Sequence, residues 1–144
     1  MTSLPHDAGC IFCKIVDGEA PSFKLYEDEL SFAIMDINPF NHGHALVLSK
    51  GHYANIHEVT DDSISAVART AKKIAAAVND VVKPDGINIV QANGQGAAQS
   101  VQHYHVHVLP RRIGDNARLN WSLTPGDQDS IAKLAADIRA ILKT

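Results

Sequence analysis

The chain has 144 residues, of which 45% are hydrophobic and 20% charged, an ordinary composition for one globular domain rather than a disordered chain. Sixteen Asp and Glu against thirteen Lys and Arg give a formal net charge of -3, which argues against a nucleic-acid polymer held by a basic field. No apolar run approaches the length of a bilayer span, and residues 1–7 lack the basic and apolar regions of a signal peptide, so the expected location is the cytoplasm.

Residues 1–9 are expected to form a loose leader before Cys10 and Cys13, the two cysteines of the chain. A Cys-x-x-Cys pair is a redox couple, half of a metal site, or a chance pairing of two small buried residues. A thioredoxin-like pair should follow a strand and open a helix, and nothing before Cys10 predicts a strand. The metal half-site is therefore favoured, with two further ligands to be found.

Short strands separated by turns are expected in the next part of the chain. A helical turn carrying Phe12 should end at the breaker cluster 17–21. His52, in a turn at residues 50–53, would ordinarily be a surface residue, and it gains weight only because the two cysteines lack partners. The predicted strands cover 23–27, 31–37 and 44–49, with a loop over 38–43.

A long amphipathic helix is predicted after residue 60. Thr60 is the expected N-cap, and Asp61 and Asp62 in the first turn suit the positive end of the helix dipole. Pro84 and Gly86 should end the helix. Its apolar residues recur at helical spacing and are Ile64, Val67, Ala68, Ala71, Ile74, Ala75 and Val78.

A buried strand is predicted over 86–93, followed by a loop of small residues over 93–100. The loop lacks the Gly-Lys-Ser/Thr ending of a P-loop and joins strand to strand, so neither nucleotide-binding fingerprint applies. Its small residues would let backbone N–H groups approach an anion closely. A glycine-rich hairpin loop is by itself a weak indication of such a site.

Histidine alternates with apolar residues over residues 103–109, which is the period of a strand. His103, His105 and His107 should therefore share one face, with same-face positions about 6.7 Å apart. Because metal–nitrogen bonds are only about 2 Å long, at most a neighbouring pair makes a natural metal site. The row is thus a nucleophilic or acid/base array, a partial metal site, or a polar strand face that is rich in histidine by chance.

The last part of the chain predicts a polar connection and then a helix from Asp127 onward. The connection follows Pro110 and contains Trp121. The apolar stripe of the helix is expected to pack on the core or on a second subunit rather than to bind a cofactor. The stripe consists of Ile131, Leu134, Ile138, Ile141 and Leu142.

Taken together, these segments resemble the histidine triad superfamily of nucleotide-binding hydrolases and transferases, most of all its nucleoside phosphoramidate hydrolases. The resemblance runs from Cys10 to Pro110. It rests first on the alternation over 103–109, with Asn93 and Ser100 before it. Further matching segments are 11–15, 36–39 and 44–47.

The resemblance implies an α+β fold with an antiparallel sheet of about five strands, a long central helix and a C-terminal helix. The whole chain, 1–144, would be a single domain with residues 111–144 as a C-terminal extension. Members are usually homodimers whose sheets join edge to edge. The implied partner is a purine nucleotide, and neither a nucleic-acid polymer nor a membrane is expected.

The chemistry of the superfamily is attack of one histidine on the α-phosphorus of a nucleotide. By position in the motif this nucleophile would be His105, and water would then cleave the nucleotidyl-histidine to release a monophosphate. A neutral imidazole, with a reference pKa of about 6.5, is available for this attack at neutral pH.

The resemblance also assigns residues that would contact the phosphate and the leaving group. His107 and Asn93 would donate hydrogen bonds to the phosphoryl oxygens. The backbone N–H groups of Ala98, Gln99 and Ser100 would do the same. The Ser100 hydroxyl would in addition assist departure of an amine.

Further residues would bind the rest of the nucleotide. His44 would line the phosphate site, and Asp36 would accept hydrogen bonds from the ribose hydroxyls. The base would lie among Phe12, Ile15, Ile37 and Leu46.

Some bacterial members hold a structural zinc ion, and the resemblance assigns its ligands to Cys10, Cys13, His52 and His103. Two cysteines and two histidines form a closed set with no open position for water, so this zinc would stabilise rather than catalyse. No organic cofactor is implied.

Other functions stay open on the sequence. The same fold supports a dinucleoside polyphosphate hydrolase or nucleotidyl transferase. A nucleotide-binding interaction protein with vestigial activity belongs to a different class. A metal-dependent oxygenase using His103 and His105 is the most distant alternative.

Overall fold

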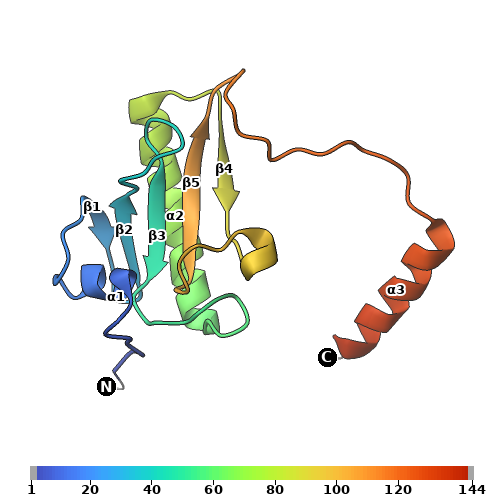
Figure 1. The fold of residues 1–144 in the computed structure, drawn as a ribbon, viewed down its shortest axis with the longest axis horizontal. Helices are drawn as coiled ribbons and strands as arrows, with labels where there is room; N and C mark the ends of the chain where they lie inside the picture. The colour runs from blue at the N-terminus through green and yellow to red at the C-terminus, as the bar shows by residue number, and fades with distance from the viewer. Residues whose placement is uncertain (1–2, 143–144) are drawn as a thin grey trace.

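A five-stranded antiparallel sheet with a long helix on one face forms the body of the protein in a computed structural model, which describes residues 3–142 (Figure 1). The strand order is β1-β2-β3-β5-β4. The predicted α+β class, with its central and C-terminal helices, is confirmed. The elements are α1 (Ile11–Val16), β1 (Lys24–Glu27), β2 (Ser31–Met35), β3 (Ala45–Ser49), α2 (Asp61–Val82), β4 (Gly86–Val90), a 3₁₀ turn (Gln95–Ala97), β5 (His105–Arg111) and α3 (Gln128–Ile141).

Helix α2 begins and ends as its sequence predicts. The Thr60 side chain accepts a hydrogen bond from the Ser63 N–H at 3.2 Å, and Asp61 and Asp62 occupy the first turn. Lys83 closes the helix in the left-handed conformation, with φ 52°. The buried stripe of α2 packs on one face of the sheet, in a core that includes Val47, Tyr104, Val106 and Val108.

The opposite face of the sheet carries a second, smaller core under α1. Side chains alternate along β3, so Val47 points to α2 while Leu46 and Leu48 point to α1. Phe12 from α1 and Phe32 from β2 complete this second core. Among the helices of residues 3–142, only the short α1 covers this face, which leaves room for a site beside it.

The histidine-containing strand starts later than predicted. Strand β5 begins at His105, and His103 lies in the irregular segment before it. Here Tyr104 pairs with the last residue of β3 on one side and with the turn after β3 on the other: Ser49 N–H donates to the Tyr104 carbonyl at 3.1 Å, and Tyr104 N–H donates to the Tyr53 carbonyl at 2.6 Å. His103 therefore leaves the row formed by His105 and His107.

The prediction of a buried strand over 86–93 was wrong in extent and in burial. Strand β4 ends at Val90 and is the edge of the sheet, paired only with β5. At this edge of the sheet, Ile89 is 54% exposed. Hydrophobicity alone does not distinguish an edge strand from a central one.

Residues 3–9, the described part of the leader, contain no helix or strand and contact the body of the protein. His52 N–H donates to the Pro5 carbonyl at 2.8 Å. The His6 ring lies 3.1 Å from the Asp17 carboxylate. These contacts place the chain just before Cys10 against the turn that carries His52.

Residues 112–127, here called the arm, contain no helix or strand and lead past β4 to α3, which stands away from the body (Figure 1). No residue of α3 is buried. The expectation that its apolar stripe packs on the core was therefore wrong for this chain's own core, and a second subunit remains the other alternative. Within residues 3–142, no helix has the length and apolar character needed to cross a membrane.

Candidate active site and metal centre

A cavity of about 470 Å³ opens on the face of the sheet beside α1. It is bounded by α1, the end of β2, β3, the segment after the 3₁₀ turn, and β5. Many residues that the sequence singles out lie around it, although they come from distant parts of the chain. Those that line it are Phe12, Ile15, Asp36, Ile37, His44, Leu46, Ser100, His105 and His107.

Asn93 does not line this cavity. Its side-chain oxygen accepts hydrogen bonds from Ile56 N–H at 2.8 Å and from the Gln91 side chain at 2.7 Å. Its side-chain amide donates to Gln91 Oε1 at 2.7 Å. The structure thus uses Asn93 to tie the end of β4 to the segment before α2, and a phosphate contact would require these bonds to rearrange.

Ala98 and Gln99 also lie outside the cavity lining. The Ala98 N–H donates to the Gln95 carbonyl at 3.0 Å, and the Gln99 N–H donates to the Gly94 carbonyl at 3.1 Å. The Gln99 side chain binds Ala54 and Val101 carbonyls and the Gly94 N–H. Because the N–H groups of Ala98 and Gln99 donate to carbonyls within the loop, they are not free to bind a phosphate. Of the three backbone donors expected here, this leaves the N–H of Ser100.

Several cavity residues were missed by the sequence analysis. Ile34 could have been found, because it lies two residues before Asp36 on one strand face. Val101 directly follows Ser100, but adjacency alone does not predict lining. Ile11 and Asn38 lie in segments that match the family but were given no role, and no pattern in the sequence indicated Pro21, Ser22 and Met35.

The protonation pattern of His105 follows from its backbone partner. Its Nδ1 lies 2.6 Å from the His103 carbonyl oxygen, which can only accept. The proton of a neutral His105 ring is therefore on Nδ1, and the lone pair is on Nε2. The ring is buried and packs edge-on against Phe12, with 5.1 Å between ring centroids, so this nitrogen is held in one orientation.

A relay of hydrogen bonds fixes the neighbouring His107. The Phe40 N–H donates to His44 Nδ1 at 3.0 Å, so the His44 proton is on Nε2. His44 Nε2 lies 2.9 Å from His107 Nδ1, which must then accept. The remaining His107 proton is on Nε2, where it is available to a group in the cavity.

Burial keeps these rings neutral. It lowers the pKa of His107 to about 4, with further lowering from His105 and His44. Burial likewise lowers the pKa of His105 and of His44, and the Asp36 carboxylate opposes both shifts. Neutral rings near pH 7 give the lone pair on His105 and the donor on His107 that the hydrogen bonds indicate.

Asp36 lies at the cavity between two anchors. One carboxylate oxygen accepts from Asn38 N–H at 2.8 Å, and the other lies 3.4 Å from His44 Nε2. The carboxylate group is largely buried but reaches the cavity. It can accept further hydrogen bonds there, as hydroxyl groups of a ligand would provide.

A second group of side chains forms a candidate metal centre at the other end of the row. Donor atoms of Cys10, Cys13, His52 and His103 all lie within 4.8 Å of one another. Cys10 Sγ and His103 Nδ1 are 3.4 Å apart, and the two imidazole Nδ1 atoms are 3.3 Å apart. Tetrahedral bonds of about 2.3 Å to sulfur and 2.05 Å to nitrogen imply about 3.6 and 3.3 Å, so the donors fit a zinc-like ion.

The surroundings of these donors also suit a metal. His103 Nε2 donates to the Ser49 carbonyl at 2.6 Å, which leaves Nδ1 unprotonated and directed at the cysteines. Burial lowers the pKa of His103 to about 4 and raises that of Cys13 to about 11. A neutral imidazole is ready to bind, and the thiol would lose its proton to the metal.

Asp36, His44 and His107 form a further group with donor atoms within 4.8 Å. Its two imidazole rings, those of His44 and His107, are already joined by a hydrogen bond of 2.9 Å. The separation of this group from the cysteine centre confirms the geometric expectation that the three histidines of the row do not converge on one ion.

Comparison with known proteins gives consistent matches. The family model described as HIT domain matches residues 17–114. The adenosine 5'-monophosphoramidase of Saccharomyces cerevisiae is 39% identical over 138 residues, covering 95% of this chain and 85% of the relative. A zinc-bound histidine triad family protein from Mycobacterium smegmatis superposes with a TM-score of 0.71 at 36% identity, covering 90% of this chain and 97% of that one.

A Streptococcus mutans protein of known crystal structure superposes with a TM-score of 0.90 at 37% identity, covering 95% of this chain and 87% of that one. The arm and α3 make up roughly a fifth of the present chain. Because the superposition covers 95% of this chain, it includes most of these residues, and the arm and α3 occupy a similar position in that protein.

Proposed function

Because this chain belongs to the HIT domain family, we propose that it is a hydrolase of nucleoside phosphoramidates and related nucleotidyl conjugates, with His105 as nucleophile. The observation that carries the proposal is the 2.6 Å contact of His105 Nδ1 with the His103 carbonyl, which leaves the Nε2 lone pair free in a cavity. The name of the yeast relative supports the same reaction.

The proposed reaction has two displacements at phosphorus. In the first, a bond forms between His105 Nε2 and the α-phosphorus while the bond to the leaving amine breaks, and the amine takes up a proton from solvent. The positive charge on the His105 ring is stabilised through its Nδ1–H and the His103 carbonyl. In the second, water attacks the phosphorus and gives up a proton to solvent, the phosphorus–Nε2 bond breaks with its electron pair returning to Nε2, and a nucleoside monophosphate is released.

His107 and Ser100 are the donors proposed for the transition state. The relay from Phe40 through His44 leaves His107 Nε2–H free to donate to a phosphoryl oxygen. Such a donor is effective because it is oriented before charge develops. The Ser100 hydroxyl, at the cavity wall, is proposed to hydrogen-bond the departing amine.

The nucleoside is proposed to occupy the rest of the cavity. Asp36 would accept hydrogen bonds from the ribose hydroxyls. The base would lie against the apolar side chains of Phe12, Ile15, Ile37 and Leu46, all of which line the cavity. A purine is favoured because the yeast relative is named for adenosine.

A structural zinc ion is proposed at Cys10, Cys13, His52 and His103. The donor separations and the zinc-bound relative from Mycobacterium smegmatis support it. The ion would fix the leader to the segment that carries His103, whose carbonyl orients His105. The exposed edge strand β4 supports the further proposal of a homodimer joined through this edge.

The test is to mix the protein with adenosine 5'-phosphoramidate, quench within milliseconds to seconds in alkali, and record the intact mass. We expect an adenylyl adduct and accumulating AMP with the natural chain, and neither with His105→Gly. Absence of both adduct and AMP from the natural chain would refute the hydrolase. Cleavage of a dinucleoside polyphosphate alone would favour the alternative substrate class.

A further inference from the structure

Helix α3 is carried by an arm whose start is rigidly fixed. Asp115 accepts two hydrogen bonds from the Arg111 guanidinium, at 2.7 and 2.8 Å, and one from the Asn41 side chain at 2.8 Å. Arg112 binds the Val82 and Lys83 carbonyls at the end of α2, at 2.8 and 2.6 Å. The arm therefore leaves the body in a set direction, past β4 (Figure 1).

The helix at the end of this arm requires a covering surface. A 14-residue helix is marginal in water by itself, and the single pair Lys133–Asp137 adds only a few tenths of a kcal/mol. The helix nonetheless carries an exposed apolar stripe: Ile131 is 52% exposed, Leu134 59% and Ile138 50%. Nothing in the described chain covers this stripe.

The similar position of the arm and α3 in the Streptococcus mutans protein indicates what the cover is. A helix that stands away from its own body in two related proteins needs a partner that both possess. A second copy of the same chain is available to each of them. The body of that second copy should then carry a complementary site.

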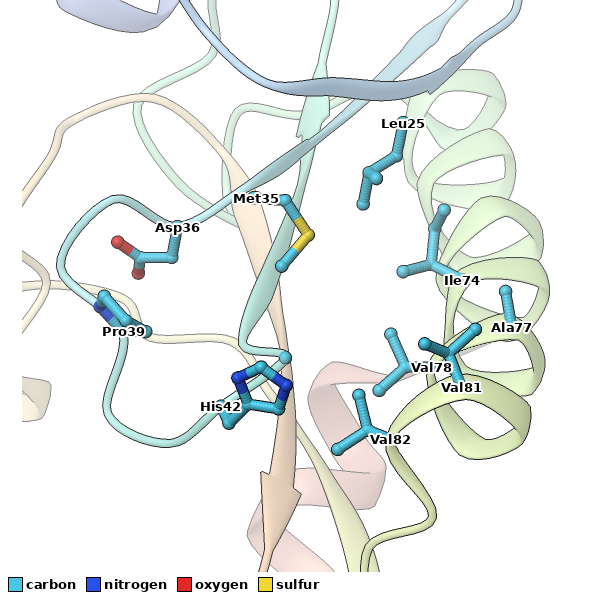
Figure 2. Close-up of a pocket in the computed structure, with 11 residues that line it drawn as sticks. Leu25, Met35, Asp36, Pro39, His42, Ile74, Ala77, Val78, Val81 and Val82 are labelled. Carbon is cyan, nitrogen blue, oxygen red and sulfur yellow. The ribbon is translucent and has the colours of Figure 1, made fainter.

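An apolar groove of about 490 Å³ lies beside the C-terminal half of α2, on the far side of α2 from β4. Figure 2 shows Val78, Val81 and Val82 of α2 facing Leu25 and Met35 across this groove. Val81 is 82% exposed and Leu25 is 45% exposed. This surface is here called the α2 groove. Like the stripe on α3, it exposes apolar side chains to solvent.

The placement of the two surfaces suits an exchange between two copies. The edge strand β4 lies on the side from which the arm extends (Figure 1). A twofold axis beside β4 would put the second body next to this edge, and each arm would then cross over that body. In such an isologous pair, whatever one arm contacts is contacted in return by the other.

We propose that α3 of one copy docks with its apolar stripe in the α2 groove of a second copy, and that the exchange is reciprocal. Asp36 lines both the α2 groove and the cavity that holds His105. The docked helix would thus lie against the loop that carries Asp36. This contact between copies lies outside the proposed chemistry of His105 and does not depend on it.

A photo-crosslink tests the contact directly. The full chain with p-benzoylphenylalanine at position 134 is prepared in ¹⁴N and ¹⁵N forms, mixed, irradiated and analysed by mass spectrometry. We expect crosslinks between isotopically different chains that end in residues 78–82, 25 or 39–42. The same label at Lys133, on the polar face, should not give them. Crosslinks within one chain, or between chains at another surface, would overturn the proposal.

Hydrogen exchange of matched variants tests the groove. Val81→Arg should lower the protection of α3 amides at least tenfold, with α2 and β4 still protected as evidence of folding. Ala76→Arg adds the same charge at an exposed α2 position outside the groove and should leave α3 protected. Unprotected α3 amides in the natural chain, or equal protection in both variants, would show that the groove does not hold α3.

Discussion

The Nδ1 atom of His105 lies 2.6 Å from the carbonyl oxygen of His103, and this contact joins the candidate metal centre to the candidate nucleophile. The His103 ring belongs to the metal-binding group, while its backbone sets the tautomer of His105. His103 thus serves both sites: its ring nitrogen lies in the metal-binding group, and its carbonyl oxygen orients His105 in the cavity.

Replacing the nucleophile should abolish turnover. His105→Asn removes the Nε2 lone pair while keeping a polar side chain, so kcat/KM for adenosine 5'-phosphoramidate should fall at least about a thousandfold. The matched control is His57→Asn, at an exposed position outside the cavity, which should stay within about twofold of the natural chain. Activity of His105→Asn close to that of the control would assign the attack to another group.

Removing the relay should affect chemistry more than binding. In His44→Phe, His107 Nδ1 loses its donor, so the ring is free to take the tautomer without a proton on Nε2. We expect kcat to fall on the order of tenfold to a hundredfold, with KM changed much less. Steady-state kinetics separate the two constants, and an effect confined to KM would contradict the relay.

Asp36→Asn should remove discrimination for the ribose hydroxyls. The amide oxygen can still accept from Asn38 N–H, so the loop is retained, but the charged acceptor for the ribose hydroxyls is lost. KM for the adenosine substrate should rise about tenfold. The decisive measurement compares ribo- and 2'-deoxyribo-substrates: the natural chain should prefer the former, and the variant should show little preference.

The buried His107 should make stability fall in mild acid. Its pKa is lowered from 6.5 to about 4 in the folded protein, so the unfolded chain takes up the proton first as pH falls. The stabilisation is complete above pH 6.5 and is lost toward pH 4, by up to about 1.4 kcal/mol per pH unit. Urea unfolding of the natural chain and His107→Gln between pH 6.5 and 5 measures it, and equal slopes would contradict the shift.

Metal binding should be visible without an activity assay. Cobalt bound at Cys10, Cys13, His52 and His103 should give a thiolate charge-transfer band in the near ultraviolet and tetrahedral bands in the visible. Cys10→Ser should weaken the charge-transfer band, and a chelator should lower the melting temperature of the natural chain by about 5 °C or more. No such band, or no effect of the chelator, would exclude a metal centre here.

Local sequence patterns predicted most of the body correctly. The spacing of apolar residues and the Thr60 cap predicted α2, because burial of one stripe and closure of the first turn depend on residues close in the chain. The alternation of His105 and Val106 predicted which side chain lies in the cavity and which packs on α2. The resemblance added cavity residues from α1, from the loop after β2 and from β3.

The amino-acid sequence by itself determined the period of each element, the ends of α2 and the chemical groups available to the site, because these depend on neighbours along the chain. Only the tertiary structure decided that β4 is an edge, that His103 leaves the strand, and that Asn93 and Gln99 are occupied by other hydrogen bonds. It also decided that α3 stands away from its own core. Each of these depends on which distant groups lie within hydrogen-bond or packing distance, and that is fixed only when the whole chain has folded.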